Sequence, residues 1–132
     1  MSEGLLEGRV ALVTGGARGI GLAISKRLHA LGASVVVADS GVSISGSDAD
    51  PAVAESVASE LGPRSAAFTS DLSEPQAAAL AVELAVSRFG GIDLVVNNAS
   101  AINLSPMRDL EVKRFDLMQQ INARGTFVVT LF

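Results

Sequence analysis

The stretch VALVTGGARGIG, residues 10–21, decides the fold of this chain. Residues 10–14 are apolar without alternation up to a terminal threonine, which is typical of a parallel strand buried on both faces. Glycines then interrupt the strand, and apolar residues return at spacings of three and four, which predicts a helix over residues 19–31 ending at Gly32. The residues at this spacing are Ile20, Ala23, Ile24, Arg27, Leu28 and Leu31. A strand, a glycine-rich turn and a helix in this order predict the first unit of a dinucleotide-binding sheet.

The rest of the chain repeats the alternation of strand and helix. Strands are predicted at residues 35–38, 65–69 and 92–96, and a long polar loop at residues 40–50. Helices are predicted at residues 51–61 with Asp50 as cap, at 76–89, and from about 111 onward with Asp109 as cap. The second of these helices is alanine-rich, with apolar Leu80, Leu84 and Val86, and we expect it to pack closely on the sheet. The order predicts one doubly wound, parallel α/β domain of the Rossmann type over residues 1–132, with strand order 3-2-1-4.

Composition narrows the class of partner. The chain has 132 residues, a formal net charge of −4 and no cysteine, which argues against a nucleic-acid or anionic-membrane partner and excludes disulfides and thiolate metal sites. No cluster of histidines and carboxylates has the spacing of metal ligands, so no metal is expected. The N-terminus lacks the basic flank and apolar core of a secretory signal, and we expect a cytoplasmic protein without membrane contact.

The glycine-rich turn has the chemistry of an anion site. A pyrophosphate placed at the N-terminus of the following helix would meet free N–H groups and the positive end of the helix dipole. A side chain at Gly15 would block the tight turn, one at Gly19 would hold the backbone away from the phosphates, and one at Gly21 would push the helix off the strand. Thr14 is expected to anchor the turn through its hydroxyl.

Asp39 ends the second predicted strand, 18 residues after Gly21. A carboxylate at this position accepts hydrogen bonds from the adenosine ribose and repels a 2′-phosphate, since two like charges about 4 Å apart cost a few kcal/mol. Arg18 would offset that repulsion if its side chain reached the phosphate. We therefore favour NAD(H) over NADP(H) as the cofactor. The alternative for Asp39 is a solvated acid at the edge of a loop.

Four motifs in order resemble those of the short-chain dehydrogenase/reductase family: TGGARGIG at residues 14–21, Asp71-Leu72, NNAS at 97–100, and Asn122 in a helix. The resemblance implies that Asp71 contacts adenine and that Asn122 belongs to a catalytic tetrad as part of a proton relay. Ser100 departs from the pattern, because the family usually has glycine there. The cofactor contacts that the motifs imply are Thr14, Gly15, Arg18, Gly19, Ile20, Gly21, Asp39, Asp71, Leu72, Asn97, Asn98 and Ala99.

The resemblance implies an NAD(P)-dependent oxidoreductase that interconverts a ketone and a secondary alcohol and forms a homo-oligomer. Residues 97–102 and 113–118 are similar to the hydroxysteroid dehydrogenase-like branch, and the loop after Asp39 to the 3-oxoacyl-thioester reductases, so a hydrophobic substrate is expected. Members use a tyrosine as acid/base, whose pKa near 10 must be lowered by a nearby lysine. This chain contains no tyrosine. We therefore interpret the chain as the cofactor-binding half of such an enzyme, C-terminally incomplete and inactive alone. The fourth strand is then expected to be an exposed edge of the sheet, and the chain alone is expected to be marginally stable or to aggregate.

Other interpretations remain open at this point. The chain could be a nucleotide-binding module or inactive remnant without redox chemistry, or a different Rossmann-type enzyme such as a methyltransferase. Asn97 and Asn98 could simply close a strand with a polar turn, Asp71 could be a turn residue, and Asn122 could be a buried amide with its partners satisfied. His29, the single histidine, has no acidic or nucleophilic neighbour in sequence and is expected to be structural.

Overall fold

A four-stranded parallel sheet with the order β3-β2-β1-β4 forms the centre of the molecule, as predicted. The computed structural model describes residues 4–41, 50–101 and 104–132. The pairing of Thr14 with Ala38, and of Val13 with Val96, brings the carboxyl ends of neighbouring strands to one edge of the sheet. The strands are β1 (Val10–Thr14), β2 (Ser34–Ala38), β3 (Ser65–Phe68) and β4 (Leu94–Val96).

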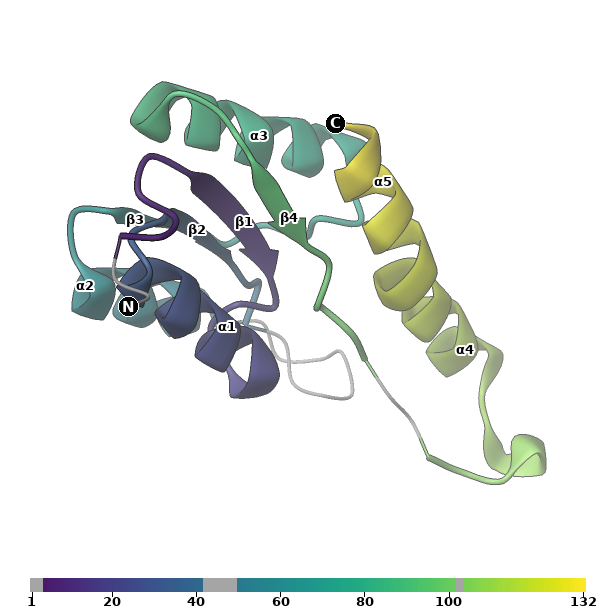
Figure 1. The fold of residues 1–132 in the computed structure, drawn as a ribbon. Helices are drawn as coiled ribbons and strands as arrows, with labels where there is room; N and C mark the ends of the chain where they lie inside the picture. The colour runs from purple at the N-terminus through teal and green to yellow at the C-terminus, as the bar shows by residue number, and fades with distance from the viewer. Residues whose placement is uncertain (1–3, 42–49, 102–103) are drawn as a thin grey trace.

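Helices cover both faces of the sheet, which confirms the doubly wound architecture (Figure 1). On one face α1 (Gly19–Ala30) and α2 (Ala52–Leu61) enclose a cluster of buried residues, namely Val13, Ala17, Ala33, Val35, Val37, Ala54 and Val57. On the other face α3 (Pro75–Phe89) and α5 (Gly125–Leu131) enclose a second cluster, namely Val10, Leu12, Val36, Ala38, Ala78, Ala81, Ala85, Val128 and Val129. The strand residues therefore alternate between two cores, which is why β1 reads as a continuous apolar run.

The predicted signals at the start of α2 and at the C-terminal ends of α1, α2 and α3 are confirmed. The Asp50 carboxylate accepts a hydrogen bond from the Ala52 backbone N–H at 3.0 Å, as a capping residue does. Gly32, Gly62 and Gly90 follow the last turns of their helices with φ values of +104°, +95° and +93°. A residue with a Cβ would be strained in this left-handed region, so glycine ends these helices at the lowest cost. Most of the loop predicted at residues 40–50, namely residues 42–49, lies outside the described residues. Ile102, the last residue of the stretch 97–102, lies outside them as well.

Small residues form the buried faces of α1 and α3. Ile20 is 75% exposed at the start of α1, and the buried positions of that helix are Gly21 and Ser25. On α3, alanines face the sheet, as expected for an alanine-rich helix that packs closely, whereas Leu80 and Val86 are 56% and 51% exposed. Small side chains let a helix backbone approach a sheet closely. Where helix and sheet are close together, small residues are therefore buried and the larger hydrophobic residues lie on the outer face.

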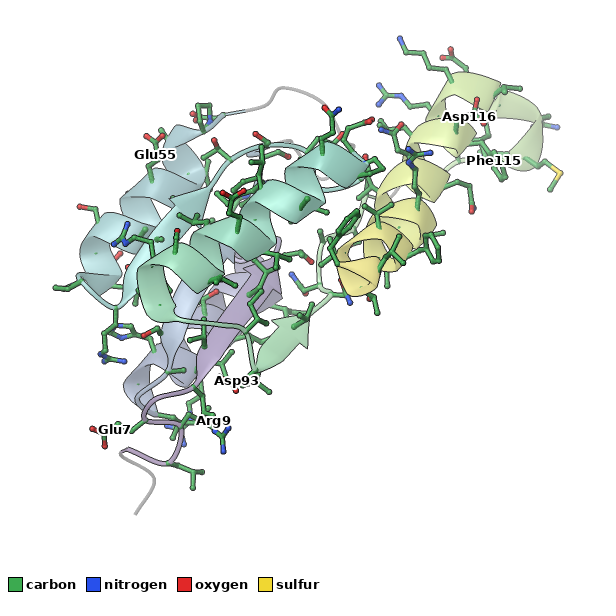
Figure 2. All side chains as sticks on the ribbon, turned by 90° about the horizontal axis from the view of Figure 1, so that it is seen from above. Glu7, Arg9, Glu55, Asp93, Phe115 and Asp116 are labelled. Carbon is green, nitrogen blue, oxygen red and sulfur yellow. The ribbon has the colours of Figure 1, made fainter. Side chains whose placement is uncertain are left out.

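The C-terminal helical segment is not a regular α-helix. It consists of α4 (Val112–Gln119), a π-helical turn η2 (Gln120–Arg124) and α5, and it stands beside the carboxyl end of β4 (Figure 1). Asp109 does not cap it, contrary to prediction: Asp109 lies in a short 3-10 turn, η1 (Met107–Asp109), and Glu111 is the residue before α4. Figure 2 shows Phe115 and Asp116 of α4 at the end of the molecule farthest from Arg9 and Asp93.

The fourth strand is a partly exposed edge, as expected. Leu94 and Val95 are 36% and 42% exposed, whereas the residues of β1 and β2 are almost fully buried. Phe127, Leu131 and Phe132 at the end of the chain are also exposed. Asp93 precedes this strand, accepts the Val10 N–H at 2.8 Å and pairs with Arg9 at 3.4 Å (Figure 2). This pair lies at the amino ends of β1 and β4, away from the edge where the strands terminate.

His29 makes the stability of the fold depend on pH. Partial burial lowers the pKa of His29 from its ordinary value of 6.5, and the positive charge of Arg64 is the second, smaller cause. The unfolded chain therefore binds the His29 proton at a higher pH than the folded chain does. Stability falls as the pH decreases from above 6.5, until the folded state is protonated too. We expect His29→Gln to weaken this pH dependence, measured as urea midpoints between pH 7.5 and 5.5 (about one pH unit on each side of the reference value).

Because the chain has a single histidine, the difference between the two proteins reports on His29 alone. An identical pH dependence in both proteins would contradict the assignment.

Candidate nucleotide-binding site

The glycine-rich turn is packed against the loop after β4. A Cβ on Gly15, which has a φ of +63°, would come within 3.0 Å of the Ala99 Cα and the Asn98 Nδ2. A Cβ on Gly21 would collide with the Gly15 carbonyl oxygen and the Asn98 amide. Gly21 is therefore needed to leave room for the turn itself, which differs from the predicted contact between helix and strand.

Gly16 is a third constrained position, which the sequence reasoning did not single out. A Cβ there would lie 2.8 Å from the Val13 carbonyl oxygen and 2.9 Å from the Ser25 Oγ. Ser25 is fully buried and donates a hydrogen bond to the Gly16 carbonyl at 2.9 Å. A polar residue four positions after Gly21, on the helix face that packs on the turn, was the available signal for Ser25.

Gly19 differs from the other glycines of the turn. Its φ is +54°, and nothing lies within 4 Å of the position that a Cβ would occupy. The space beside the first turn of α1 is therefore open, and the backbone there is accessible to a ligand. A helix of 12 residues begins at this point, so its unpaired N–H groups and dipole favour an anion.

Thr14 anchors a different loop from the one predicted. Its hydroxyl donates to the Val96 carbonyl at 3.3 Å and accepts the Asn98 and Ala99 N–H groups at 3.0 Å each. The Asn98 side chain in turn donates to the Gly15 carbonyl at 3.2 Å. Thr14 thus holds the loop after β4 on the end of β1, and Asn98 ties that loop to the glycine-rich turn.

Asp39 lies at the end of β2 and is only 7% exposed. Its Oδ2 accepts the Ala17 N–H at 3.2 Å, and its Oδ1 accepts the Gly41 N–H at 2.8 Å and the Arg18 guanidinium at 3.2 Å. The carboxylate therefore joins the glycine-rich turn to the segment after β2. Arg18 is paired with this carboxylate, so the two charges that bear on the choice of cofactor are in direct contact.

Asp71 lies in the segment after β3 and is exposed. Its Oδ1 accepts hydrogen bonds from the Ser73 N–H at 2.9 Å and the Ser73 hydroxyl at 2.7 Å. Leu72 between them is partly buried against the α3 side of the sheet. Sequence reasoning did not identify Ser73 as a site residue, and its side chain is buried, with 2% of the residue exposed. A serine two residues after an aspartate is a common turn pattern and does not by itself indicate a site. In the structure Ser73 also accepts hydrogen bonds from Gln120 and Arg124.

Asn97 and Asn122 connect the loop after β4 to the C-terminal helical segment. The Asn97 Nδ2 donates to the Thr130 hydroxyl at 3.2 Å. The Asn122 Oδ1 accepts the Ala101 N–H at 2.8 Å, and its Nδ2 donates to the Ala101 carbonyl at 2.8 Å. Both ends of the Asn122 amide are therefore engaged by a single residue of the loop.

A cleft of about 700 Å³ opens where these loops meet, at the carboxyl edge of the sheet. All the predicted cofactor contacts line it except Gly21, which lies beneath the turn. Asn122 does not line the cleft, although Ile121 and Gly125 beside it do. The lining residues that sequence reasoning did not name as cofactor contacts are Ala38, Ser40, Thr69, Ser70, Ser73, Ser100, Leu117, Ile121, Gly125, Thr126 and Val129.

Within residues 4–41, 50–101 and 104–132, histidine, aspartate and glutamate side chains nowhere gather in a group of three or more that could hold a metal ion. None of the helices described is long and apolar enough to cross a membrane.

Comparison with known proteins identifies the family. The family model described as short chain dehydrogenase matches residues 9–131, and the chain belongs to this family of NAD(P)-binding oxidoreductases. Among solved structures, 3-ketoacyl-(acyl-carrier-protein) reductase from Brucella melitensis, determined with NADH, matches with a TM-score of 0.85 and 37% identity over 96% of this chain.

Curated relatives with different names match nearly the whole chain. The human hydroxysteroid dehydrogenase-like protein 2 is 36% identical over 98% of this chain, and the short chain dehydrogenase/reductase AacuN of Aspergillus aculeatus is 39% identical over 94%. The chain spans 31% and 45% of these two relatives and 49% of the Brucella reductase. The activity of a whole relative is therefore carried to this chain only as a proposal.

Proposed function

We propose that this chain is the cofactor-binding half of an oxidoreductase that interconverts a ketone and a secondary alcohol on a hydrophobic substrate. The observation that carries the proposal is the cleft at the carboxyl edge of the sheet, where the glycine-rich turn, Asp39, Asp71 and the loop after β4 meet. Ligands of open α/β sheets bind at this edge. When bound, a nicotinamide dinucleotide would supply or accept the hydride.

The residues of the cleft fit a dinucleotide. The open space beside Gly19 at the N-terminus of α1 suits a pyrophosphate. The Asp39 carboxylate suits the ribose hydroxyls, because an ionised carboxylate accepts hydrogen bonds and does not donate them. A buried negative charge there disfavours a 2′-phosphate, and this supports NAD(H) over NADP(H).

We propose that Asn122 supports proton transfer in the complete enzyme by fixing the backbone of Ala101 beside the cleft. Both ends of its amide bond to Ala101, so the side chain acts on the position of that loop. The sequence contains no tyrosine to serve as the acid/base, and we expect no turnover by this chain alone. The cytoplasmic location and the homo-oligomeric complete enzyme stay predictions from the sequence.

Titration of NADH fluorescence with the purified chain tests the proposal. We expect saturable binding of NADH, weaker binding of NADPH, and no oxidation of NADH with ketone substrates. Absence of saturable NADH binding would overturn it.

The lack of tyrosine also suits a nucleotide-binding module without redox chemistry. A Tyr-x-x-x-Lys motif in coding sequence downstream of Phe132 would favour the enzyme, whereas an intact reading frame without one would favour the module.

Neutralising Asp39 is expected to shift the preference from NADH toward NADPH. The Asp39→Asn change removes a charge of the same sign as the 2′-phosphate and leaves Arg18 to favour that phosphate. We expect the ratio of the two dissociation constants to change by about tenfold or more, as like charges about 4 Å apart cost several kcal/mol at an intermediate dielectric. Asp93→Asn is the matched control, because it removes the same charge at the opposite edge of the sheet. Equal ratios in the two variants would contradict the role of Asp39.

A further inference from the structure

The π-helical turn η2 lies between two loops of the cleft. Leu117, Ile121, Gly125 and Val129 recur at four-residue spacing and line the cleft itself. On one side of this row, Asn122 bonds to the loop after β4. On the other side, Gln120 and Arg124 bond to the segment after β3. Local π-helical geometry is frequent at functional sites, and here it places polar side chains on both loops.

Gln120 contacts the segment after β3 through Ser73. Its Nε2 donates to the Ser73 hydroxyl at 2.9 Å, and the same hydroxyl donates to the Asp71 Oδ1 at 2.7 Å. The Arg124 Nε donates to the Ser73 carbonyl at 2.9 Å, which holds the same residue from a second position. These contacts form a directed chain of hydrogen bonds from Gln120 through Ser73 to the Asp71 carboxylate. Because Ser73 is 2% exposed, water has little access to replace them.

This arrangement divides the two oxygens of Asp71. The Oδ1 accepts two hydrogen bonds from Ser73, whereas the Oδ2 has only a long contact of 3.5 Å with the Gln120 Nε2. The Oδ2 therefore keeps capacity to accept a hydrogen bond from a ligand in the cleft that Asp71 lines. Adenine offers such a donor in its exocyclic amino group, and hypoxanthine has a carbonyl oxygen in its place.

We infer that Gln120 is a positioning residue for recognition of the adenine amino group, acting through Ser73 on the Asp71 carboxylate. The inference rests on the proposed function, because it assumes that the cleft binds an adenine dinucleotide. With Gln120 in place, Ser73 keeps its hydroxyl proton directed at Oδ1 and leaves Oδ2 to the ligand. Without it, the Ser73 hydroxyl loses its donor and the carboxylate loses its fixed orientation.

The test compares NADH with reduced nicotinamide hypoxanthine dinucleotide, which differs from NADH at the purine alone. In the unsubstituted chain we expect NADH to bind more tightly than the hypoxanthine analogue. Gln120→Leu is expected to reduce this preference about fivefold, the size of one ordinary hydrogen bond between neutral groups, mainly by weakening the binding of NADH. Ser73→Ala removes the hydroxyl that links Gln120 to Asp71, and it is expected to reduce the preference for NADH similarly. This variant replaces Gln120→Leu in the test if Gln120→Leu does not fold.

Gln119→Leu is the matched control, since Gln119 is the preceding residue, is exposed, and makes no side-chain hydrogen bond to the described parts of the chain. It should leave the preference unchanged. Equal weakening of both nucleotides by Gln120→Leu would show a merely structural role and overturn the inference, as would no change in either. Absence of NADH binding to the unsubstituted chain would overturn the proposed function and, with it, this inference.

Discussion

Replacing Gly21 by alanine is expected to weaken NADH binding strongly. The added Cβ would collide with the Gly15 carbonyl oxygen and the Asn98 amide, which are hydrogen-bonded to each other. Relief of the collision requires α1 to move away from the turn or the turn to open. Either change displaces the backbone N–H groups that the pyrophosphate needs. We expect a rise in the dissociation constant of more than about tenfold, together with about 1–3 kcal/mol of destabilisation from overpacking.

Fluorescence titration and urea denaturation of the same Gly21→Ala sample measure the two effects separately. Gly91→Ala is the matched control: nothing lies within 4 Å of its added Cβ, and its φ lies outside the left-handed region. It should bind NADH as the unsubstituted chain does. Normal NADH affinity in the Gly21→Ala protein would show that the turn tolerates the extra atom and that the contact has been misassigned.

Replacing Leu12 by alanine is expected to destabilise the fold by about 2–5 kcal/mol. Leu12 is fully buried in β1 and belongs to the core between the sheet and the helices α3 and α5. Removal of its side chain loses the transfer free energy of the methyl and methylene groups and leaves a cavity between the sheet and these helices. Urea denaturation followed by circular dichroism measures the change in the free energy of unfolding.

Leu104→Ala provides the comparison for Leu12→Ala. Leu104 is 88% exposed, so the same chemical change should alter stability by less than about 0.5 kcal/mol. A loss below about 1 kcal/mol for Leu12→Ala would contradict the packing of β1 described above, since a fully enclosed leucine does not lose so little.

Strands and sheet order were predictable because their signals are local. Residues 10–13 and 35–38 are apolar on both faces, as expected for a strand covered by two helical layers. Short connections and right-handed crossovers then leave few alternatives to the observed order. Glycines and Asp50 marked the helix ends for the same reason, since each acts within about one turn of its own position.

Hydrophobicity alone does not decide which side chains of a helix are buried. Ile20 and Leu80 are exposed, whereas Ser25 and the alanines of α3 are buried. In each case the deciding quantity is the distance between helix and sheet or turn, which favours small side chains where backbones approach closely. Sequence spacing contains no direct measure of that distance.

The sequence by itself determined the family and the glycine-rich turn. It also determined that Asp39, Asp71 and Asn98 gather at one edge of the sheet, because each lies within three residues of the end of a parallel strand. Only the tertiary structure decided what those side chains bond to. Thr14 holds a loop that is more than 80 residues away in sequence. Gln120 reaches Ser73 across 47 residues, from a turn whose π-helical geometry no spacing rule predicted. Such contacts depend on how a helix is placed and rotated against a loop, and packing of the whole chain sets both.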